Sequence, residues 1–257
     1  MDDLRLIDTF SGIGGFSYAA EKLVGGFKTV AFVECEPFCQ KVLQKHWPDV
    51  PIYEDIRTYK PEPYSAEVLV GGFPCVDISF AGKQAGITKE TRSGLFYEII
   101  RLIRLVSPRF IILENVAAII NNGLGVVLGE LASAGYSTDW CCIRASDLGG
   151  SHKRDRWFSV SYVANTNSEG LQGFRSKHEL QKSSTERQAC WSPSRITLEQ
   201  DWRRYLSKPT VSRGNDVIPN WLHRSKRIKA LGNSLVPAVA AIPLKRVLDL
   251  ANAAQDI

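Results

Sequence analysis

A short apolar segment runs directly into a glycine-rich turn that ends in a cysteine. Residues 68–70 are Val-Leu-Val, and the sequence Gly-Gly-Phe-Pro-Cys follows and ends at Cys75. The glycines let the backbone turn sharply or approach a ligand closely, and Pro74 favours an extended conformation for the residue before it. The strand and stiffened turn would hold a thiol in place, as a nucleophile requires, because only a positioned thiolate attacks well. A buried structural cysteine is the alternative.

Length and composition predict one large globular domain, or one domain with a smaller appendage. The 257 residues are 44% hydrophobic and 23% charged. No apolar run approaches the roughly 18 residues of a membrane span, and the acidic start Met1-Asp2-Asp3 lacks the basic residues of a signal peptide. The six cysteines form no CxxC pair and the four histidines are scattered, so no metal site is expected. We expect a cytoplasmic protein.

Positive charge is concentrated in one part of the chain. The segment from Asn165 to Lys229 carries 13 lysines and arginines against 6 acidic residues, a net charge of +7, whereas the whole chain carries +5. It also contains interspersed tryptophans and lacks strand or helix periodicity up to about Asn220. Basic residues with aromatics suit nucleic-acid contact, although a solvated loop is the alternative.

The first 23 residues have the order strand, glycine turn, helix. The apolar pattern of residues 4–10 predicts the first strand, and we expect a helix from about Ser17 to Leu23. Gly12 and Gly14 match the spacing of the dinucleotide fingerprint, but Ser17 stands where its third glycine would be. The pattern therefore favours a nucleotide or cofactor cradle without specifying NAD.

Acidic residues close the next two predicted strands. Residues 29–33 form a strand that ends at Glu34, 20 residues after Gly14, where a carboxylate could bind both ribose hydroxyls of an adenosine. A helix from Pro37 to His46 follows. A short strand at 51–53 precedes Asp55, which could accept a hydrogen bond from an exocyclic amine. Ordinary strand-end carboxylates are the alternative.

A third carboxylate follows the most apolar strand. The segment from Phe80 to Arg92 lacks periodicity and is predicted to be a mobile loop, and a helix capped by Ser93 follows it. Residues 110–113 are all apolar, which predicts a strand buried on both faces, and Glu114 comes directly after them. A carboxyl group there is paired or has a raised pKa, and in the latter case it can donate a proton.

Basic residues share one face of a later extended segment. After a helix at 125–134 and a strand at 137–145, His152, Arg154 and Arg156 alternate along the chain before an apolar strand that ends at Val163. They could contact phosphate or stabilise a nearby carboxylate, and a solvent-facing edge strand is the alternative. A final helix is predicted at 238–254.

Strands alternating with helices predict an α/β fold. Ligand sites of such sheets lie at the carboxyl ends of the strands. Five predicted strand ends carry candidate residues, and together they predict one site: Phe10 with Gly12, Glu34, Asp55, Cys75 and Glu114.

Five blocks of the chain resemble DNA (cytosine-5)-methyltransferases of bacterial or phage type. They occur in the order of that family, over roughly residues 1–163 and 226–257: Asp8–Phe16, Gly72–Cys75, Glu114–Val116, Arg154–Arg156 and Gly232–Pro237. The resemblance implies a Rossmann-like sheet that uses S-adenosylmethionine, with a small irregular target-recognition insert. It implies a catalytic domain at 1–164, a recognition region at 165–225 and a returning segment at 226–257.

The resemblance also implies a role for each matching residue. Cys75 would add to carbon 6 of a flipped cytosine, Glu114 would act on ring nitrogen 3, and Arg154 and Arg156 would orient Glu114 and the base. The implied cofactor residues are Phe10, Gly12, Gly14, Glu34, Asp55, Pro74, Leu95, Asn233 and Ser234. The implied partners are double-stranded DNA and a possible cognate restriction endonuclease, with no membrane contact, and we expect a monomer.

The chain departs from the family pattern at two positions. His152 stands where many members have glutamine, and Val76 replaces the common glutamine after the Pro-Cys pair. Neither change removes a reacting group, so activity is expected. An RNA cytosine methyltransferase and a catalytically silent DNA-binding homologue are the alternatives. A nicotinamide-dependent oxidoreductase is disfavoured by Ser17 and by a site built around a cysteine.

Overall fold

Three parallel strands buried on both faces form the centre of the sheet. β1 (Leu4–Thr9), β4 (Val68–Gly72) and β5 (Phe110–Val116) pair side by side in the computed structural model, which describes residues 2–74, 87, 92–148, 154–163 and 235–254. Near-continuous apolar runs such as Val68-Leu69-Val70 are typical of strands that are covered on both sides.

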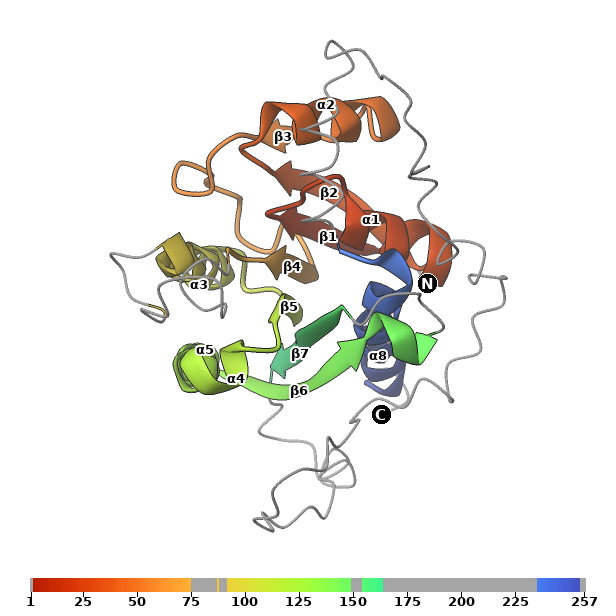
Figure 1. Cartoon of the computed structure of the whole chain (residues 1–257). Coiled ribbons are helices and arrows are strands. Elements are labelled where there is room, and N and C mark those ends of the chain that lie inside the picture. Colours follow the sequence, from red (N-terminus) through yellow and green to blue (C-terminus); the bar gives the residue numbers. More distant parts are fainter. Residues whose placement is uncertain (1, 75–86, 88–91, 149–153, 164–234, 255–257) are drawn as a thin grey trace, which may run out of the picture.

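The other strands extend this centre in both directions (Figure 1). β2 (Phe27–Val33) pairs in parallel with β1, and β3 (Ile52–Tyr53) pairs with β2. β7 (Asp155–Val163) pairs antiparallel with β5, and β6 (Tyr136–Arg144) pairs antiparallel with β7. Within the described residues the strand order is therefore β3-β2-β1-β4-β5-β7-β6.

Helices cover both faces of the sheet (Figure 1). On one face lie α1 (Gly15–Tyr18), its π-helical continuation η1 (Ala19–Val24) and α8 (Pro237–Ala253). On the other lie α3 (Phe96–Val106), which follows the 3-10 helix η2 (Arg92–Leu95), and α5 (Leu124–Ser133), which follows the short α4 (Ile119–Asn122). α2 (Pro37–His46) lies beside β3, and the 3-10 helix η3 (Ala145–Leu148) follows β6.

Alternation along each strand divides the core into two parts. Leu6, Val70 and Ile112 point to the face of α1 and α8, whereas Ile7, Leu69 and Ile111 point to the face of α3 and α5. The sheet and its two helical layers confirm the predicted α/β class. The helix predicted at Pro37–His46 has those bounds, because Pro37 suits a first helical position.

Several predicted boundaries are wrong. The first strand ends at Thr9, because Phe10 has a φ of +54°, and the helix after the glycine turn begins at Gly15 rather than Ser17. α3 begins at Phe96, with Leu95 rather than Ser93 at its N-cap. β5 continues through Val116, so that Glu114 lies within the strand. It continues because β7 supplies hydrogen-bonding partners along the whole of its length.

The alternative for the face of Arg154 and Arg156, a solvent-facing edge strand, does not hold in the described residues. β7 lies between β5 and β6, and Trp157 and Phe158 at its centre are fully buried. The recognition insert at 165–225, the loop at 80–92 apart from Ile87 and Arg92, and the thiol of Cys75 lie outside the described residues.

Close strand packing predicts the effect of a methyl group at Gly71. A Cβ there would lie 2.5 Å from Thr9 Oγ1 and 3.2 Å from Ile99 Cδ1, and Thr9 is fixed because its hydroxyl donates to the carbonyl of Val70. We expect Gly71→Ala to lower the free energy of unfolding by about 1–3 kcal/mol, as overpacking does. Chemical denaturation measures the change.

The matched control is Gly129→Ala in the middle of α5. A Cβ there meets no atom within 4 Å, so the substitution should raise the free energy of unfolding by about 0.5–1 kcal/mol. Equal stability of the two variants would contradict the close approach of β1 and β4.

Candidate active site

The glycine turn after β1 requires unusual backbone conformations. Phe10, Gly12 and Gly14 all have positive φ, at 54°, 55° and 83°. A Cβ on Gly14 would lie 2.7 Å from the indole ring of Trp47, so this position has no room for a side chain. Strained non-glycine residues such as Phe10 persist where the surrounding structure fixes them, and they are concentrated at functional sites.

Glu34 holds the glycine turn from the end of β2. One carboxylate oxygen accepts the backbone N–H of Gly12 at 2.7 Å, and the other accepts that of Glu36 at 2.7 Å. The carbonyl of Val33, the last residue of β2, also accepts the N–H of Ser11 at 3.3 Å. Gly12 and Glu34 are thus brought together as the sequence predicted, and each oxygen of Glu34 retains a lone pair for a ligand.

Asp55 is engaged by a neighbouring arginine. Arg57 donates side-chain hydrogen bonds to both carboxylate oxygens, at 2.7 Å from Nη2 and 3.0 Å from Nε, and its backbone N–H donates as well. These hydrogen bonds lower the pKa of Asp55. Arg101 on α3 fixes the same loop by donating to the carbonyls of Ile56 and Tyr59. A ligand amine at Asp55 would therefore share a carboxylate that Arg57 already binds.

Glu114 lies on β5 directly opposite Gly72 of β4. A Cβ on Gly72 would lie 3.0 Å from Oε2 of Glu114, so the glycine gives the carboxylate its space. The other oxygen, Oε1, accepts a hydrogen bond at 2.8 Å from Nε of Arg156, a diagonal neighbour across the β5–β7 pair. Phe73 and Pro74 are the two residues between Gly72, which lies opposite this carboxylate, and Cys75.

Burial dominates the electrostatics of Glu114. Its side chain is 16% exposed, and desolvation raises the pKa of the carboxyl group more than the positive charges of Arg156 and Arg154 lower it. The sequence predicted pairing or a raised pKa as alternatives, and the structure has both. A carboxyl group with a raised pKa beside a guanidinium suits a proton donor held in one orientation.

Asn115 is a site residue that the sequence reasoning missed. Its side chain is 1% exposed, its Nδ2 donates to the carbonyl of Phe73 at 3.1 Å, and its Oδ1 accepts the N–H of Val116. It therefore ties the turn before Cys75 to β5. An amide directly after Glu114, at the end of an apolar run, was the available signal, because buried polar groups are almost always hydrogen-bonded.

The other residues that the sequence predicted for the site either lie near Glu34 and Glu114 or fall outside the described residues. Phe10 and Leu95 are half-buried and pack against the core on the α3 side, and Pro74 is half-buried at the end of the turn. Arg154 is half-buried and acts on Glu114 through its charge. Cys75, Asn233 and Ser234 lie outside the described residues.

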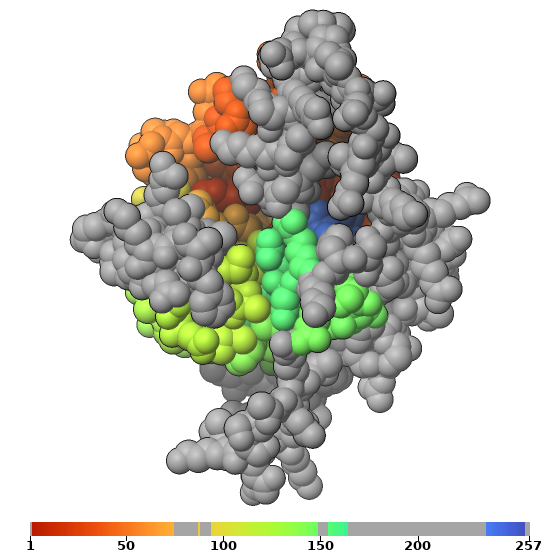
Figure 2. Space-filling model, viewed as in Figure 1, coloured from red at the N-terminus to blue at the C-terminus, as the bar shows by residue number. Residues whose placement is uncertain are grey.

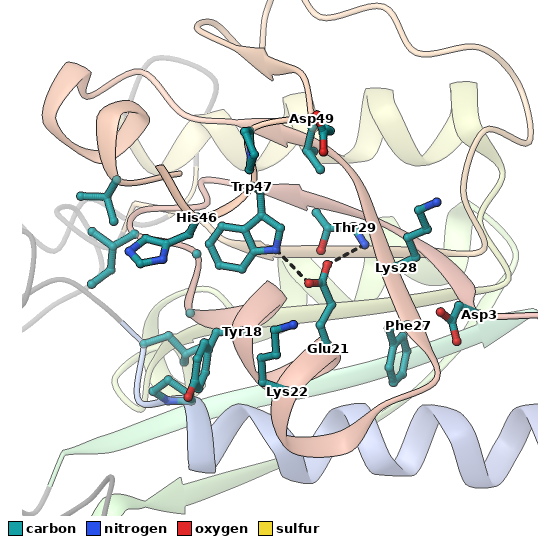
Figure 3. Close-up of a pocket in the computed structure, with 18 residues that line it drawn as sticks. Asp3, Tyr18, Glu21, Lys22, Phe27, Lys28, Thr29, His46, Trp47 and Asp49 are labelled. Atoms are coloured by element: carbon teal, nitrogen blue, oxygen red, sulfur yellow. Dashed lines mark hydrogen bonds between the residues drawn. The ribbon is translucent and has the colours of Figure 1, made fainter. Parts of the chain in front are cut away.

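A groove lies behind the glycine turn, with Gly14 in its lining. It measures about 1010 Å³ and runs between α1 with η1 and the end of α2 (Figure 3). Glu21 at its centre accepts hydrogen bonds from Nε1 of Trp47 at 2.9 Å and from the N–H of Thr29 at 3.0 Å. Neither Glu34 nor Glu114 lines this groove. We therefore interpret the hydrogen bonds of Glu21 as contacts that stabilise the glycine turn on the side away from Glu34.

No group of three or more metal-binding side chains occurs among the described residues. No helix in that part of the chain is long and apolar enough to cross a membrane.

A family model supplies the decisive comparison. The model for C-5 cytosine-specific DNA methylases matches residues 4–236, which include both clusters built around Glu34 and Glu114. The chain belongs to the C-5 cytosine-specific DNA methylase family.

Curated relatives of this DNA methylase are Type II methyltransferases. M.CviJI of Paramecium bursaria Chlorella virus IL3A is 32% identical over 160 residues, which are 61% of this chain and 42% of the relative. M.HhaI of Haemophilus parahaemolyticus is 30% identical over 173 residues, 66% of this chain and 52% of the relative. The alignments thus span about half the length of the relatives or less.

Solved structures of low identity share the fold. Dnmt2 methyltransferase of S. pombe has a TM-score of 0.53 at 17% identity, covering 79% of this chain and 63% of that one. The Entamoeba histolytica methyltransferase EhMeth has a TM-score of 0.50 at 15% identity, over 66% and 56% of the two chains. Both likenesses confirm the Rossmann-like methyltransferase fold that the resemblance implied.

The contact between Asn115 and Phe73 predicts a loss of stability on substitution. Asn115→Ala removes the hydrogen bonds that the side chain makes to the carbonyl of Phe73 and to the N–H of Val116. The free energy of unfolding should therefore fall by about 1–3 kcal/mol. Asn115→Asp should be no better, because a carboxylate cannot donate to Phe73. Ser133→Ala, which removes an exposed hydroxyl that donates to Gly129, is the control and should change stability by less than about 0.5 kcal/mol.

Proposed function

We propose that this methylase transfers a methyl group from S-adenosylmethionine to carbon 5 of a cytosine in a specific DNA sequence. The observation that carries the proposal is the buried carboxyl group of Glu114, held by Arg156 opposite the glycine turn that leads to Cys75. Family membership and the Type II methyltransferase relatives support it.

The glycine turn fits a bound cofactor. A Cβ on Gly12 would meet no atom within 4 Å, so there is open space beside this half-buried backbone, and the partly buried carboxylate of Glu34 borders the same turn. We assign the cofactor to Phe10, Gly12, Gly14, Glu34, Asp55, Pro74 and Leu95, with Asn233 and Ser234 outside the described residues. When bound, S-adenosylmethionine supplies an electrophilic methyl group.

Cys75 is proposed as the nucleophile. Its thiolate adds to carbon 6 of the cytosine while Glu114 gives a proton or hydrogen bond to ring nitrogen 3, so that electron density moves to carbon 5. Carbon 5 would take the methyl group, with S-adenosylhomocysteine as the leaving group. The proton of carbon 5 then leaves to a base, the bond between sulfur and carbon 6 breaks, and ring nitrogen 3 returns any proton to Glu114, so that the thiolate and 5-methylcytosine are released. The raised pKa of Glu114 keeps its carboxyl group protonated at higher pH than that of an ordinary glutamic acid.

The described cysteines are poor alternatives to Cys75. Cys39 and Cys141 are buried, and burial raises the pKa of the Cys142 thiol to about 11. Cys35 is exposed, but partial desolvation of its thiol raises the pKa, and the nearby charge of Glu34 raises it further. Because the thiolate is the reactive form, these environments disfavour nucleophilic attack.

The proposed partner is double-stranded DNA. A cytosine inside a duplex is out of reach of a thiol, so the base must be flipped at a cost of a few kcal/mol of unstacking. The segment 165–229, with its net charge of +7, is proposed to hold the DNA and to select the sequence, and it lies outside the described residues. A cognate restriction endonuclease, a cytoplasmic location and a monomeric state remain predictions.

Cys75→Ala should abolish methyl transfer and leave cofactor affinity nearly unchanged, because the thiol reacts with the base. Radiolabelled methyl transfer to duplex DNA and to tRNA, together with calorimetric binding of S-adenosylmethionine, measures both quantities. Turnover near the wild-type rate would refute the nucleophile, and transfer to tRNA alone would favour the RNA alternative. A cytosine analogue blocked at carbon 5 should become attached to Cys75, and attachment to Cys141 or Cys142 would contradict the assignment.

Glu114→Gln keeps the shape of the side chain and removes its acid proton. We expect turnover to fall by about 10²–10⁴-fold, the usual scale of general acid–base catalysis, with little change in cofactor affinity. Because the acid form is the active one, wild-type turnover should fall as pH rises through the raised pKa of Glu114, and the variant should lack this limb. Normal turnover with weak cofactor binding would place Glu114 outside the base site.

The basic segment predicts salt-dependent DNA binding. If its lysines and arginines contact phosphates, affinity should fall steeply with salt as counterions are released. Replacing one phosphate-contacting residue should lower the slope of that dependence by about one unit for all sequences alike. Exchanging residues 165–220 with the segment of a relative of different specificity should transfer the target sequence. An active chimera that keeps the original target would contradict the role of the segment.

A further inference from the structure

Arg101 on α3 holds the turn that carries Asp55. Its Nη2 donates to the carbonyl of Ile56 at 2.5 Å, and its Nη1 donates to the carbonyl of Tyr59 at 3.1 Å. Nε of the same guanidinium donates at 2.6 Å to Glu98, three residues earlier on α3. The planar group thus presents a fixed fork of donors to its own helix and to two carbonyls that are 45 and 42 positions away in the sequence.

The carboxylate of Asp55 belongs to the turn that Arg101 holds. Its Oδ1 accepts the backbone N–H of Arg57 at 2.9 Å, and the backbone carbonyl of Asp55 accepts the N–H groups of Thr58 and Tyr59, both at 3.1 Å. Side-chain and main-chain groups of Asp55 are therefore bound within one turn. A rotation of that turn moves the carboxylate with it.

Apolar packing and hydrogen bonds place this turn in different ways. Ile56 and Tyr59 are 5% and 6% exposed, and they lie in the same half of the core as Phe96 and Ile99 of α3. Apolar contact is non-directional, whereas a hydrogen bond requires alignment of donor and acceptor. The buried side chains therefore place the turn against α3, and Arg101 sets the direction of its carbonyls.

The turn lies beside the carboxylate that holds the glycine turn. Asp55 follows β3, and the carbonyl of Tyr53, the last residue of β3, accepts the N–H of Glu34 at 2.9 Å. The residues assigned to the ribose and to the exocyclic amine, Glu34 and Asp55, thus follow the neighbouring parallel strands β2 and β3. An adenosine that contacts both requires Asp55 at a defined distance and direction from Glu34.

We propose that Arg101 is a positioning residue for adenine recognition, which orients the carboxylate of Asp55 toward the exocyclic amine of the cofactor. Arg57 binds the same carboxylate, but it belongs to the same turn and its side chain is 68% exposed, so it moves with Asp55. Arg101 reaches the turn from α3, a helix anchored in the core by buried residues along its whole length. The inference rests on the proposed function, because it takes S-adenosylmethionine as the ligand.

The binding of two ligands by the full chain tests this role. S-adenosylhomocysteine carries the exocyclic amine, and its purine analogue has a hydrogen atom in that place. In the wild type, isothermal titration calorimetry should show about tenfold weaker binding of the analogue, because it lacks one hydrogen bond to a carboxylate. In Arg101→Gln the turn loses its alignment with α3, so S-adenosylhomocysteine should lose most of this advantage and the two dissociation constants should approach each other.

Two further variants complete the test. Arg101→Lys keeps the positive charge without the planar fork, so its ratio of dissociation constants should lie between those of the wild type and Arg101→Gln. It also decides the question should Arg101→Gln fail to fold. Arg104→Gln is the matched control, because Arg104 lies on the same helix and pairs instead with Glu130 of α5 at 3.4 Å. This control should keep the wild-type ratio.

Steady-state kinetics of methyl transfer give a second readout. Arg101→Gln should raise the KM for S-adenosylmethionine by the factor that calorimetry finds for S-adenosylhomocysteine. The KM for DNA and kcat should stay nearly unchanged, because the amine contact contributes equally to binding in the ground state and in the transition state.

The outcomes separate the two proposals. If neither ligand binds to the wild type, the proposed function fails and this inference fails with it. If S-adenosylhomocysteine binds and Arg101→Gln keeps the wild-type ratio, only the inference is overturned. An equal loss for both ligands in Arg101→Gln would also overturn it, because Arg101 would then support the fold without orienting Asp55. Equal binding of both ligands by the wild type would do the same, because there would be no amine contact to position.

Discussion

The buried ion pair between Glu114 and Arg156 is the contact on which the arrangement of the site depends. A carboxylate at the centre of an apolar sheet is costly unless a cation and hydrogen bonds compensate for lost water. β7 provides that cation only because it inserts antiparallel between β5 and β6, which places Arg156 diagonally across from Glu114. The order of the strands (Figure 1) therefore decides which charge lies beside Glu114. The pKa of Glu114 stays raised, because burial outweighs that charge.

Glycines at the ends of two adjacent strands, in β4 and just after β1, give the site its space. Gly71 and Gly72 let β4 approach Thr9 and Glu114, while Gly12 and Gly14 let the turn after β1 reach the carboxylate of Glu34. Each turn is tied down by a buried polar side chain, Asn115 for the first and Asp8, which accepts a hydrogen bond from Ser17, for the second. In the space-filling view, described atoms of the N-terminal part (red to orange) lie near those of the later segments (yellow-green to green) (Figure 2).

Strand order along the chain and the residues at strand ends could be predicted from the sequence. Apolar runs such as Phe110–Leu113 and the glycines that follow Val70 are local signals, and Pro37 fixed a helix start. The strand pairings and hydrogen bonds that hold the site together could not be predicted, because the periodicity of one segment does not identify the segment that it pairs with. The insertion of β7, the extension of β5 past Glu114, and the anchoring roles of Asn115 and Ser17 all depend on residues 9 to 52 positions away in the sequence. Asp55 shows the same limit, since Arg57 engages the carboxylate that was predicted for a ligand.

The central claim is that these strand ends form a DNA cytosine-5 methylation site. Its most direct test is base-resolution mapping of 5-methylcytosine in DNA from cells that express the chain, compared with cells that carry the empty vector. The account predicts 5-methylcytosine at one short recurring sequence in the expressing cells alone. Expression of folded protein without any new 5-methylcytosine in the DNA would contradict it.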